Sequence, residues 1–474
     1  MPSPENHSPS HHPQAGPYAH RVHRYTPEAD RSAQALADCC LDRLARMHPL
    51  NRPATPEQLE AAAGATVLPH GLGADEALRL WTDVLAPACL SVDHPRYLSF
   101  IPSAPSTAAA AFDMLVGASN VYGGSWLEGS GAVYAENQAL RWIAELAGLP
   151  PTSGGVFAQG GTVANLSALV AAREAALERR GSRRPPRWAV CLTEETHSSV
   201  KHALRVVMDV EVIEIPGDER GRMTGEALRR AVSELSASTV DGIFAAVATA
   251  GTTNVGGVDD IAGIADVAAD HGWWLHVDGA YGGAGLAAPS IRHLFRGIDR
   301  ADSFIVDPHK WLFAPFDSCA LLYRDPVLGR AAHTLHAGYL DPVNAPDQWN
   351  PSDFSIQLTR RARGLPFWFS LAVHGTDAYR DAIEQTLDVA RAGAAIIRAA
   401  DHVRLLVEPD LSVLIFERIG WSADDYALWS ARLLAEQVAF VTPTRHRNQP
   451  CTRFAIVNPL TTADDLALII ESMQ

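Results

Sequence analysis

The sequence predicts an α/β protein with a mostly parallel sheet in a large domain, an N-terminal helical segment and a small C-terminal α+β domain. Three observations support this fold class. Strand-like apolar runs alternate with helical runs from about residue 155, helical patterns alone precede them, and a mixed pattern follows from about residue 370. Alternating strands and helices are typical of a parallel sheet that is covered on both faces.

The length and composition fit one large domain with smaller attachments. The 474 residues are 47% hydrophobic and 20% charged, which is enough for a substantial core. The net charge of −15 argues against nucleic acid or an anionic membrane as the main partner. The six cysteines form no CxxC pair, no apolar run approaches a membrane span of about 18 residues, and the N-terminus lacks a signal-peptide layout. We therefore expect reduced thiols and a cytoplasmic location.

The N-terminal part divides into a tail and a helical segment. Residues 1–25 are rich in Pro, Ser and His, and we expect a disordered tail. Its His cluster could bind metal, but a solvated tail is the favoured interpretation, because His-rich tracts are weak signals. Residues 26–95 are predicted to be helical, because Thr26-Pro27 and Thr55-Pro56 each place a Thr N-cap before a Pro. With no strands to cover, these helices are expected to pack against the main domain or a partner subunit and to serve dimerisation.

The large domain is predicted over residues 96–369 and the small domain over residues 370–474. Helical runs of the large domain begin near Thr162, Ser198, Thr224 and Asp259. Its predicted strands are 188–192, 210–215, 243–249, 273–277, 303–306 and 319–323. The small domain is predicted to begin with a long helix, followed by strands 403–408 and 411–418, a helix near 422–437, a strand at 451–457 and a short last helix.

Polar residues that follow the predicted strands are the candidate site, because ligands of open α/β sheets bind beyond the carboxyl ends of the strands. Gln159-Gly160-Gly161-Thr162 precedes a helical run, and such a turn at a helix N-terminus can bind a phosphate group. An ordinary structural turn explains these residues equally well. His197 follows strand 188–192 and could stack on a flat ring, although a simple helix cap is the alternative.

Asp278 and Lys310 are the two charged candidates at strand ends. A carboxylate after the apolar run ending at Val277 requires a cationic partner, and a protonated pyridine nitrogen would be one. The small residues that follow Asp278 leave room for a ligand, which disfavours a plain helix cap. Lys310 lies between His309 and Trp311, where desolvation would lower its pKa as a Schiff-base amine requires. An isolated lysine would instead be a solvated surface residue.

Phosphate turn, stacking His, pyridinium Asp and Schiff-base Lys follow one another in the order found in fold-type I pyridoxal-phosphate enzymes. The chain resembles the group II pyridoxal-dependent decarboxylases, which include aromatic-L-amino-acid, histidine and glutamate decarboxylases. The resemblance runs from about residue 26 to the C-terminus. It is carried by His94-Pro95-Arg96-Tyr97, Gly160-Gly161-Thr162, Thr196-His197-Ser198-Ser199, Gly251-Thr252-Thr253, His276-Val277-Asp278-Gly279-Ala280-Tyr281, Asp302-Ser303-Phe304 and Pro308-His309-Lys310-Trp311.

The resemblance implies pyridoxal 5′-phosphate as the cofactor and a role for each matching residue. Lys310 would carry the cofactor as a Schiff base, and Tyr339 of a mobile loop would donate a proton from the neighbouring subunit of a homodimer. The implied catalytic residues are Lys310, His197, Tyr339 and Asp278. The implied cofactor-binding residues are Gly161, Thr162, His197, Thr253, Asp278, Ala280, His309 and Lys310. The candidate substrate-binding residues are Phe100, Ser103, Tyr122, Trp126 and Arg360.

Two positions depart from the family pattern. Many eukaryotic relatives have Asn where this chain has Asp307, and an Asp close to phosphate would repel it. Relatives that act on catechol or indole substrates have a Phe where this chain has Gly124, so the pocket could be larger or differently shaped, with Phe100, Tyr122 and Trp126 still supplying aromatic walls.

The resemblance implies decarboxylation of an L-amino acid to its amine, with an aromatic substrate favoured and aliphatic or acidic substrates left open. One alternative is a relative that oxidatively deaminates its substrate to an aldehyde; Tyr339 favours decarboxylation, because such relatives typically have Phe there. A second alternative is a non-catalytic homologue. The presence of Lys310, Asp278 and His197 argues against it.

Overall fold

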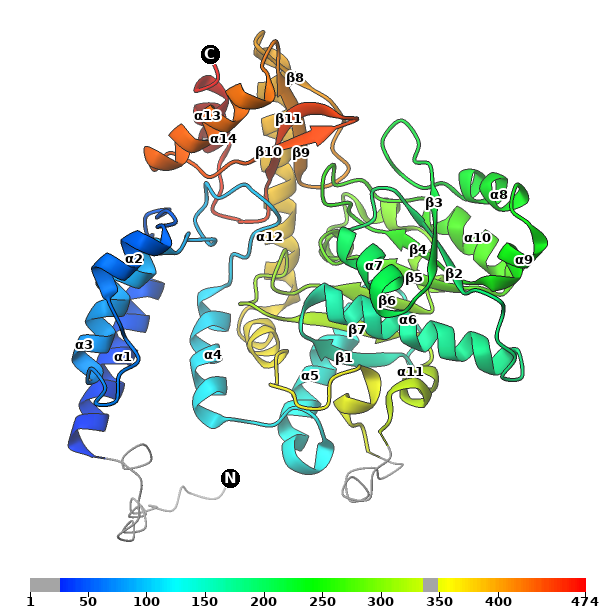
Figure 1. The fold of residues 1–474 in the computed structure, drawn as a ribbon, viewed down its shortest axis with the longest axis horizontal. Coiled ribbons are helices and arrows are strands. Elements are labelled where there is room, and N and C mark those ends of the chain that lie inside the picture. Colours follow the sequence, from blue (N-terminus) through cyan, green and yellow to red (C-terminus); the bar gives the residue numbers. More distant parts are fainter. Residues whose placement is uncertain (1–25, 336–347) are drawn as a thin grey trace. The chain divides into compact units, whose positions relative to one another are not determined.

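The computed structural model describes residues 26–335 and 348–474, which form two compact units. The first unit contains residues 26–47 and 53–89, and the second contains residues 48–52 and the chain from Leu90 onward. Figure 1 draws the described elements with their labels. The predicted tail, residues 1–25, lies outside the described residues, as does Tyr339.

The first unit is helical, as predicted. Thr26 caps the first helix by accepting a hydrogen bond from the Ala29 amide at 3.1 Å, and Thr55 caps the second by accepting from the Gln58 amide at 3.2 Å. Both helices have Pro in the first turn. The elements are α1 (Pro27–Ala45), α2 (Pro56–Ala63), α3 (Ala74–Leu80), the π-helical turn η2 (Trp81–Leu85) and the 3-10 turn η3 (Ala86–Ala88).

The large sheet of the second unit confirms the predicted fold class. Within the described residues it has seven strands in the order β1-β7-β6-β5-β4-β2-β3. Strands β6, β5, β4, β2 and β3 are parallel, and β7 is antiparallel to both of its neighbours. The strands are β1 (Gly154–Ala158), β2 (Ala189–Thr193), β3 (Glu211–Ile215), β4 (Ile243–Thr249), β5 (Trp274–Asp278), β6 (Ser303–Val306) and β7 (Cys319–Tyr323).

Helices cover both faces of this sheet (Figure 1). Side chains of α6, α7 and α11 pack in the core on one face, and those of α5, α8 and α10 pack on the other. The helices of this part are α4 (Thr107–Ser119), α5 (Trp126–Leu146), α6 (Gly160–Arg179), α7 (Ser198–His202), α8 (Gly225–Ser233), α9 (Ala237–Gly242), α10 (Ile261–His271) and α11 (Pro326–His333).

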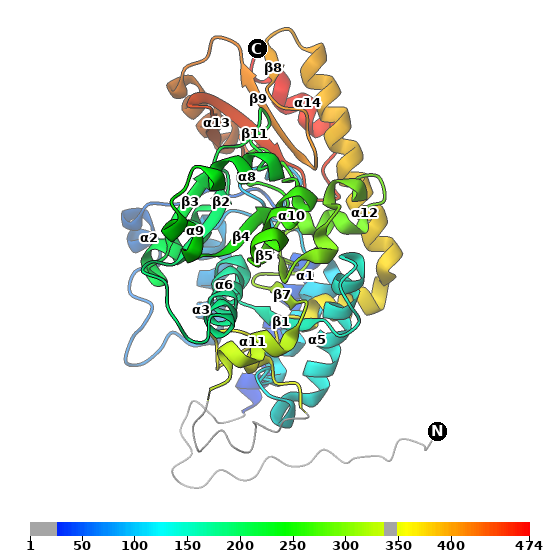
Figure 2. The same ribbon diagram turned by 90° about the vertical axis from the view of Figure 1, so that its right-hand side faces the viewer.

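A four-stranded antiparallel sheet follows, in the order β10-β11-β9-β8. The long helix α12 contacts α4 and α5 near its start and β8 and β9 farther along. Figure 2 shows α12 running from α5 up to the four-stranded sheet. The elements are α12 (Leu365–Ala399), β8 (Val403–Leu405), β9 (Val413–Arg418), α13 (Ala423–Ala435), β10 (Pro443–His446), β11 (Gln449–Ala455) and α14 (Ala463–Glu471). Throughout residues 26–335 and 348–474, every helix is too short or too polar to cross a bilayer.

Candidate active site

A cavity of about 290 Å³ lies beyond the carboxyl ends of β1, β2, β4, β5 and β6, where the sequence placed the candidate site. All eight predicted cofactor-binding residues line it. The lining residues are Gln159, Gly160, Gly161, Thr162, Asn165, His197, Ser199, Thr249, Gly251, Thr253, Asp278, Ala280, Tyr281, Asp307, His309, Lys310 and Asp317. The parallel strands therefore bring together residues that are as far apart in the chain as Gln159 and Asp317.

Lys310 is paired with Asp307 on the loop that follows β6. The Lys310 Nζ atom lies 2.9 Å from Asp307 Oδ2, and His309 Nε2 lies 3.8 Å from the same oxygen. Burial opposes the charge of Lys310, but the Asp307 carboxylate outweighs it and raises the lysine pKa. The sequence-based expectation of a lowered pKa is therefore wrong for Lys310, because an anionic partner lies three residues before it.

Asp307 is buried, and its charge is compensated by its neighbours. Burial raises the pKa of this carboxyl, but Lys310 and His309 outweigh burial and hold the pKa below its ordinary value. A Cβ atom built on Gly161 would lie 3.3 Å from Asp307 Oδ2, so the carboxylate lies against the glycine turn. The repulsion expected between Asp307 and a phosphate group is thus offset by two adjacent cationic or proton-bearing side chains.

The glycine turn opens helix α6 directly at the cavity. Gly160 has a φ of 73°, a backbone conformation that glycine adopts without strain. No side chain of the described residues caps this 20-residue helix, so the first backbone N–H groups of α6 are available to a ligand. A helix N-terminus with free donors and the positive end of the helix dipole fits a phosphate group.

Asp278 ends β5 with both carboxylate oxygens engaged. Oδ1 accepts a hydrogen bond from the Ala280 amide at 3.0 Å, and Oδ2 accepts one from Asn165 Nδ2 at 3.0 Å. The side chain is 4% exposed, and no salt bridge pairs it with a cationic side chain of the described residues. Each carboxylate oxygen can accept a second hydrogen bond, which leaves capacity for a protonated ring nitrogen.

His197 is the helix cap that was considered for it, and it also lies at the cavity. It is the N-cap of α7, where its Nδ1 accepts from the Ser199 amide at 3.3 Å and lies 2.7 Å from Ser199 Oγ. Its ring nevertheless lines the cavity. Because Nδ1 accepts hydrogen bonds, the ring proton is on Nε2, and the cap fixes the orientation of the ring.

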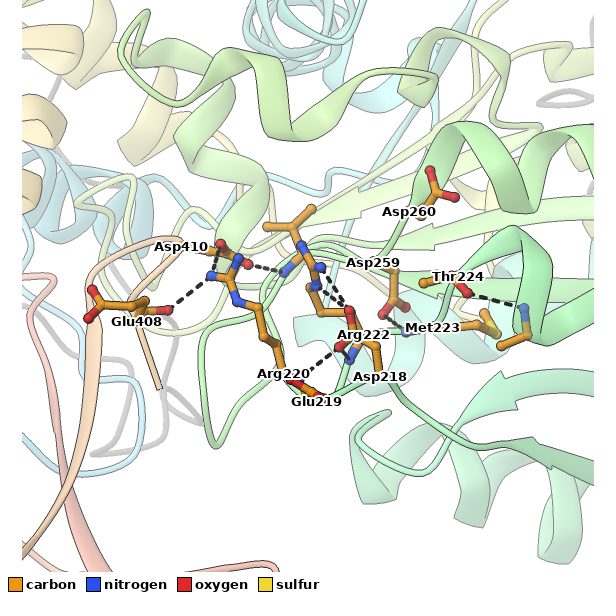
Figure 3. A network of polar contacts seen from close by, with 12 residues as sticks. Asp218, Glu219, Arg220, Arg222, Met223, Thr224, Asp259, Asp260, Glu408 and Asp410 are labelled. Atoms are coloured by element: carbon orange, nitrogen blue, oxygen red, sulfur yellow. Dashed lines mark hydrogen bonds and ion pairs between the residues drawn. The ribbon is translucent and has the colours of Figure 1, made fainter. Parts of the chain in front are cut away.

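Thr253 lines the cavity from a turn between β4 and α10. Asp259, farther along the same connection, belongs to the polar network drawn in Figure 3. Asp259 accepts hydrogen bonds from the Met223 and Thr249 amides, each at 2.7 Å, and thereby ties this turn to the end of β4. The Val258 amide donates to Asp410 Oδ2 at 3.3 Å, and Arg220 pairs with the same carboxylate. The turn is thus fixed from both the large sheet and the loop between β8 and β9.

The five candidate substrate-binding residues lie away from the cavity, and their role stays a prediction. Arg360 is buried and donates to Ser355 Oγ at 2.7 Å and to the Phe157 carbonyl oxygen. Phe100 is 58% exposed, and Trp126 is the first residue of α5. The Ser103 hydroxyl donates to the Ala314 carbonyl oxygen at 3.1 Å. The Tyr122 hydroxyl donates to the Leu358 carbonyl oxygen at 2.7 Å.

The Gly124 departure has a local steric reason. A Cβ atom built on Gly124 would lie 2.3 Å from the Tyr122 ring. A side chain at position 124 and the observed Tyr122 position therefore exclude each other, and Tyr122 fills the space beside Gly124.

Sequence reasoning missed several lining residues, of which Asn165 has the most direct contact with the site. It lies one turn into α6, three residues after Thr162, so helical periodicity could have placed it on the face of the phosphate turn. Thr249 and Asp317 were also missed, whereas Ser199 and Tyr281 belong to the motifs that carry the family resemblance but had no predicted site role. Asp317 pairs with Arg363, so its charge is compensated.

The donor set fits a ligand that carries a phosphate, a flat ring with a basic nitrogen, and a group that reacts with an amine. The uncapped N-terminus of α6, the Asp278 carboxylate and Lys310 lie around one cavity and match these three features. The residues present therefore fit pyridoxal 5′-phosphate. In the described part of the chain, no cluster of three or more His, Cys, Asp or Glu residues is arranged to bind a metal ion.

Comparison with known proteins agrees with this donor set. The pyridoxal-dependent decarboxylase conserved domain matches residues 56–419. An aromatic-L-amino-acid decarboxylase from Bacillus atrophaeus is 31% identical over 80% of each chain. An L-2,4-diaminobutyrate decarboxylase from Rhizobium meliloti (strain 1021) is 31% identical over 81% of this chain and 78% of its own. The crystal structure of Oryza sativa TDC with PLP and tryptamine has a TM-score of 0.86 and 25% identity, and covers 95% of this chain and 99% of that one.

Proposed function

The chain belongs to the pyridoxal-dependent decarboxylase family, whose members are carboxy-lyases that use pyridoxal 5′-phosphate, and on this premise we propose that it decarboxylates an aromatic L-amino acid to the amine. The observation that carries the proposal is the arrangement around one cavity of Lys310, the Asp278 carboxylate and the uncapped N-terminus of α6. This arrangement matches the chemistry of the cofactor at its aldehyde, ring nitrogen and phosphate.

We assign the roles as follows. Lys310 holds the cofactor covalently and releases the product amine. Gly161 and Thr162 bind the phosphate with the first amides of α6, while His197 and Ala280 flank the ring. When bound, the cofactor supplies a protonated pyridine ring that takes up the electron pair left when CO2 departs. Asp278 keeps the proton on the ring nitrogen, because a buried carboxylate stabilises an adjacent cation.

Tyr339 is the proposed donor of the proton that returns to Cα. It lies outside the described residues. We propose that the chain acts as a cytoplasmic homodimer with the site at the subunit interface, as the family resemblance implies. The molar mass of the active protein in solution, measured by light scattering, tests this; an active monomer would contradict it.

The lysine assignment has an unusually clean test, because the chain contains only two lysines, Lys201 and Lys310. Lys201 pairs with Glu214 at 2.9 Å and is absent from the cavity, so it is the matched control. Borohydride reduction of the protein with pyridoxal phosphate should label Lys310, as located by peptide mass spectrometry. Lys310→Ala should lose both the label and CO2 release, whereas Lys201→Ala should keep both. A label on Lys201, or turnover by Lys310→Ala, would contradict the assignment.

An aromatic substrate is favoured by the names of two relatives. The Bacillus atrophaeus protein is an aromatic-L-amino-acid decarboxylase, and the Oryza sativa structure contains tryptamine. A basic substrate, as the Rhizobium meliloti relative would suggest, needs a free carboxylate. Of the cavity carboxylates, Asp307 and Asp317 are paired with Lys310 and Arg363, and Asp278 is assigned to the ring nitrogen. A screen of L-amino acids for CO2 release tests this preference. Release of peroxide and ammonia instead would favour oxidative deamination to an aldehyde.

A further inference from the structure

One face of strand β5 carries polar and indole side chains at every second position. Trp274, His276 and Asp278 alternate along the strand and therefore point to the same side of the sheet. Ser303 of β6 is the register partner of His276. Helix α6 packs on this face and brings Asn165 to it. All five side chains are buried to at least 96%.

A continuous series of hydrogen bonds joins these five side chains. Trp274 Nε1 lies 2.7 Å from Ser303 Oγ, and Ser303 Oγ lies 2.8 Å from His276 Nδ1. His276 Nε2 lies 2.7 Å from Asn165 Oδ1, and Asn165 Nδ2 lies 3.0 Å from Asp278 Oδ2. The first four residues, Trp274, Ser303, His276 and Asn165, are called the donor chain below.

Chemistry fixes the direction of every bond in the donor chain. An ionised Asp278 can only accept, so the Asn165 atom facing it is the amide nitrogen, and Asn165 Oδ1 must then accept from His276. His276 therefore carries its proton on Nε2. Burial lowers the pKa of His276 to about 4, so the ring is neutral and its Nδ1 accepts the Ser303 hydroxyl proton. The Trp274 indole can only donate, and it donates to Ser303 Oγ.

Each donor in the chain points toward Asp278, and each member is hydrogen-bonded on both sides apart from Trp274 at its start. Because the donor chain is neutral, it fixes the orientation of the Asp278 carboxylate without placing a positive charge beside it. A cationic His276 would instead share the charge of Asp278 and weaken its pairing with another cation.

We propose that the donor chain positions Asp278 so that its carboxylate selects a protonated ring nitrogen, which makes Asn165 and His276 positioning residues for cofactor recognition. The inference depends on the proposed function only through the role of Asp278. Its consequence is specific: the donor chain contributes to binding of a ligand that has the ring nitrogen and contributes nothing for a ligand that lacks it.

The test compares two ligands on the full-length protein after removal of its cofactor. Pyridoxal 5′-phosphate is one, and its 1-deaza analogue, in which C–H replaces the ring nitrogen, is the other. Both carry the same aldehyde and phosphate, so the ratio of their dissociation constants isolates the nitrogen. Asn165→Leu should reduce the wild-type ratio about ten-fold, since hydrogen bonds to charged groups contribute more than neutral ones.

Ser303→Ala should reduce the ratio by a smaller factor, because the His276 tautomer loses its support while the Asn165 contact remains. Ser370→Ala is the matched control, since Ser370 is also a fully buried hydroxyl between two partners, Ser106 and Tyr379, and is not in the cavity. It should keep the wild-type ratio. If Asn165→Leu does not fold, Ser303→Ala and His276→Gln decide by the same ratio.

The possible failures are distinguishable. If the wild type prefers pyridoxal phosphate and the variants keep the same preference, the donor chain has no role in recognition. If the wild type binds both ligands equally, the role of Asp278 is wrong and the donor chain falls with it. If the wild type binds neither ligand, the proposed function itself is contradicted.

Discussion

Two buried carboxylates, Asp278 and Asp259, lie near the ends of neighbouring strands but are stabilised in opposite ways. Asp278 accepts from one backbone amide and from Asn165, behind which the donor chain is neutral. Asp259 accepts from two backbone amides, and charged residues surround it (Figure 3). Burial raises the pKa of Asp259 to about 7, whereas two backbone hydrogen bonds lower it and Asp218 adds to the rise.

The difference matches two different roles: Asp278 is placed to recognise a cation, whereas Asp259 supports the turn that carries Thr253. Neutral hydrogen-bond donors inside the sheet fix Asp278, and pH and salt affect such donors little. The Asp278 carboxylate can still accept a hydrogen bond from a cation. The Asp259 region, which supports the turn carrying Thr253, depends on ionisable groups. Its outer members Arg222 and Arg220 pair with Asp218 and Asp410 and are partly exposed. Of these two regions, we therefore expect pH and salt to act mainly on the Asp259 region.

Asp278→Asn should have the largest effect on activity. Removing one charge from a buried ion pair typically costs about 3–5 kcal/mol, so CO2 release should fall at least about 100-fold. Asn can still accept the Ala280 amide, but its amide nitrogen would then face Asn165 Nδ2, so the variant should also lose about 1–3 kcal/mol of stability. Steady-state assays with thermal melts check both. Activity within ten-fold of wild type would show that the Asp278 region recognises no cation.

Asp259→Asn should affect stability more than chemistry. The amide nitrogen of Asn would face either the Met223 or the Thr249 amide, and the stranded donor should cost about 1–3 kcal/mol. Denaturant unfolding measures this loss. Asp260→Asn is the control, since Asp260 caps α10 from an exposed position and Asn caps helices about as well as Asp. Equal losses in both variants would mean that Asp259 does not support the turn.

The same variant gives a pH test with a defined sign. The pKa of Asp259 is about 7 in the folded protein against 3.8 ordinarily, so the folded state binds the proton more tightly. Its contribution to wild-type stability is therefore complete below about pH 4 and declines as pH rises to about 7. The stability gap between wild type and Asp259→Asn should shrink over this range. A gap that widens with pH would contradict the raised pKa.

The site residues at the strand ends could be predicted, because their common location follows from the strand order and from where each strand ends. Strand β1 was missed because Gly154 and Gly155 have low strand propensity. Glycine is nevertheless required at position 155, because a Cβ atom there would lie 1.7 Å from the Leu321 carbonyl oxygen of β7. Asn165 was missed because its contact with Asp278 crosses from a helix to a strand 113 residues away. The raised pKa of Lys310 could not be predicted, because it depends on the side-chain rotamers that bring Lys310 to Asp307.

Arg220→Ala should have the smallest effect and should reveal the salt dependence of the Asp259 region. Arg220 pairs with Asp410, which also accepts from the Val258 amide, but the Arg220 side chain is 36% exposed. Such pairs contribute at most about 1 kcal/mol, so affinity for pyridoxal phosphate should fall by no more than about five-fold in low salt. Raising the salt concentration should weaken the wild type toward the variant, since screening acts on exposed charges. Arg391→Ala, which removes an exposed pair with Asp388, should leave the affinity unchanged. A salt-independent loss would place the effect of Arg220 in packing instead of charge, and the salt sensitivity expected of the Asp259 region would then be wrong.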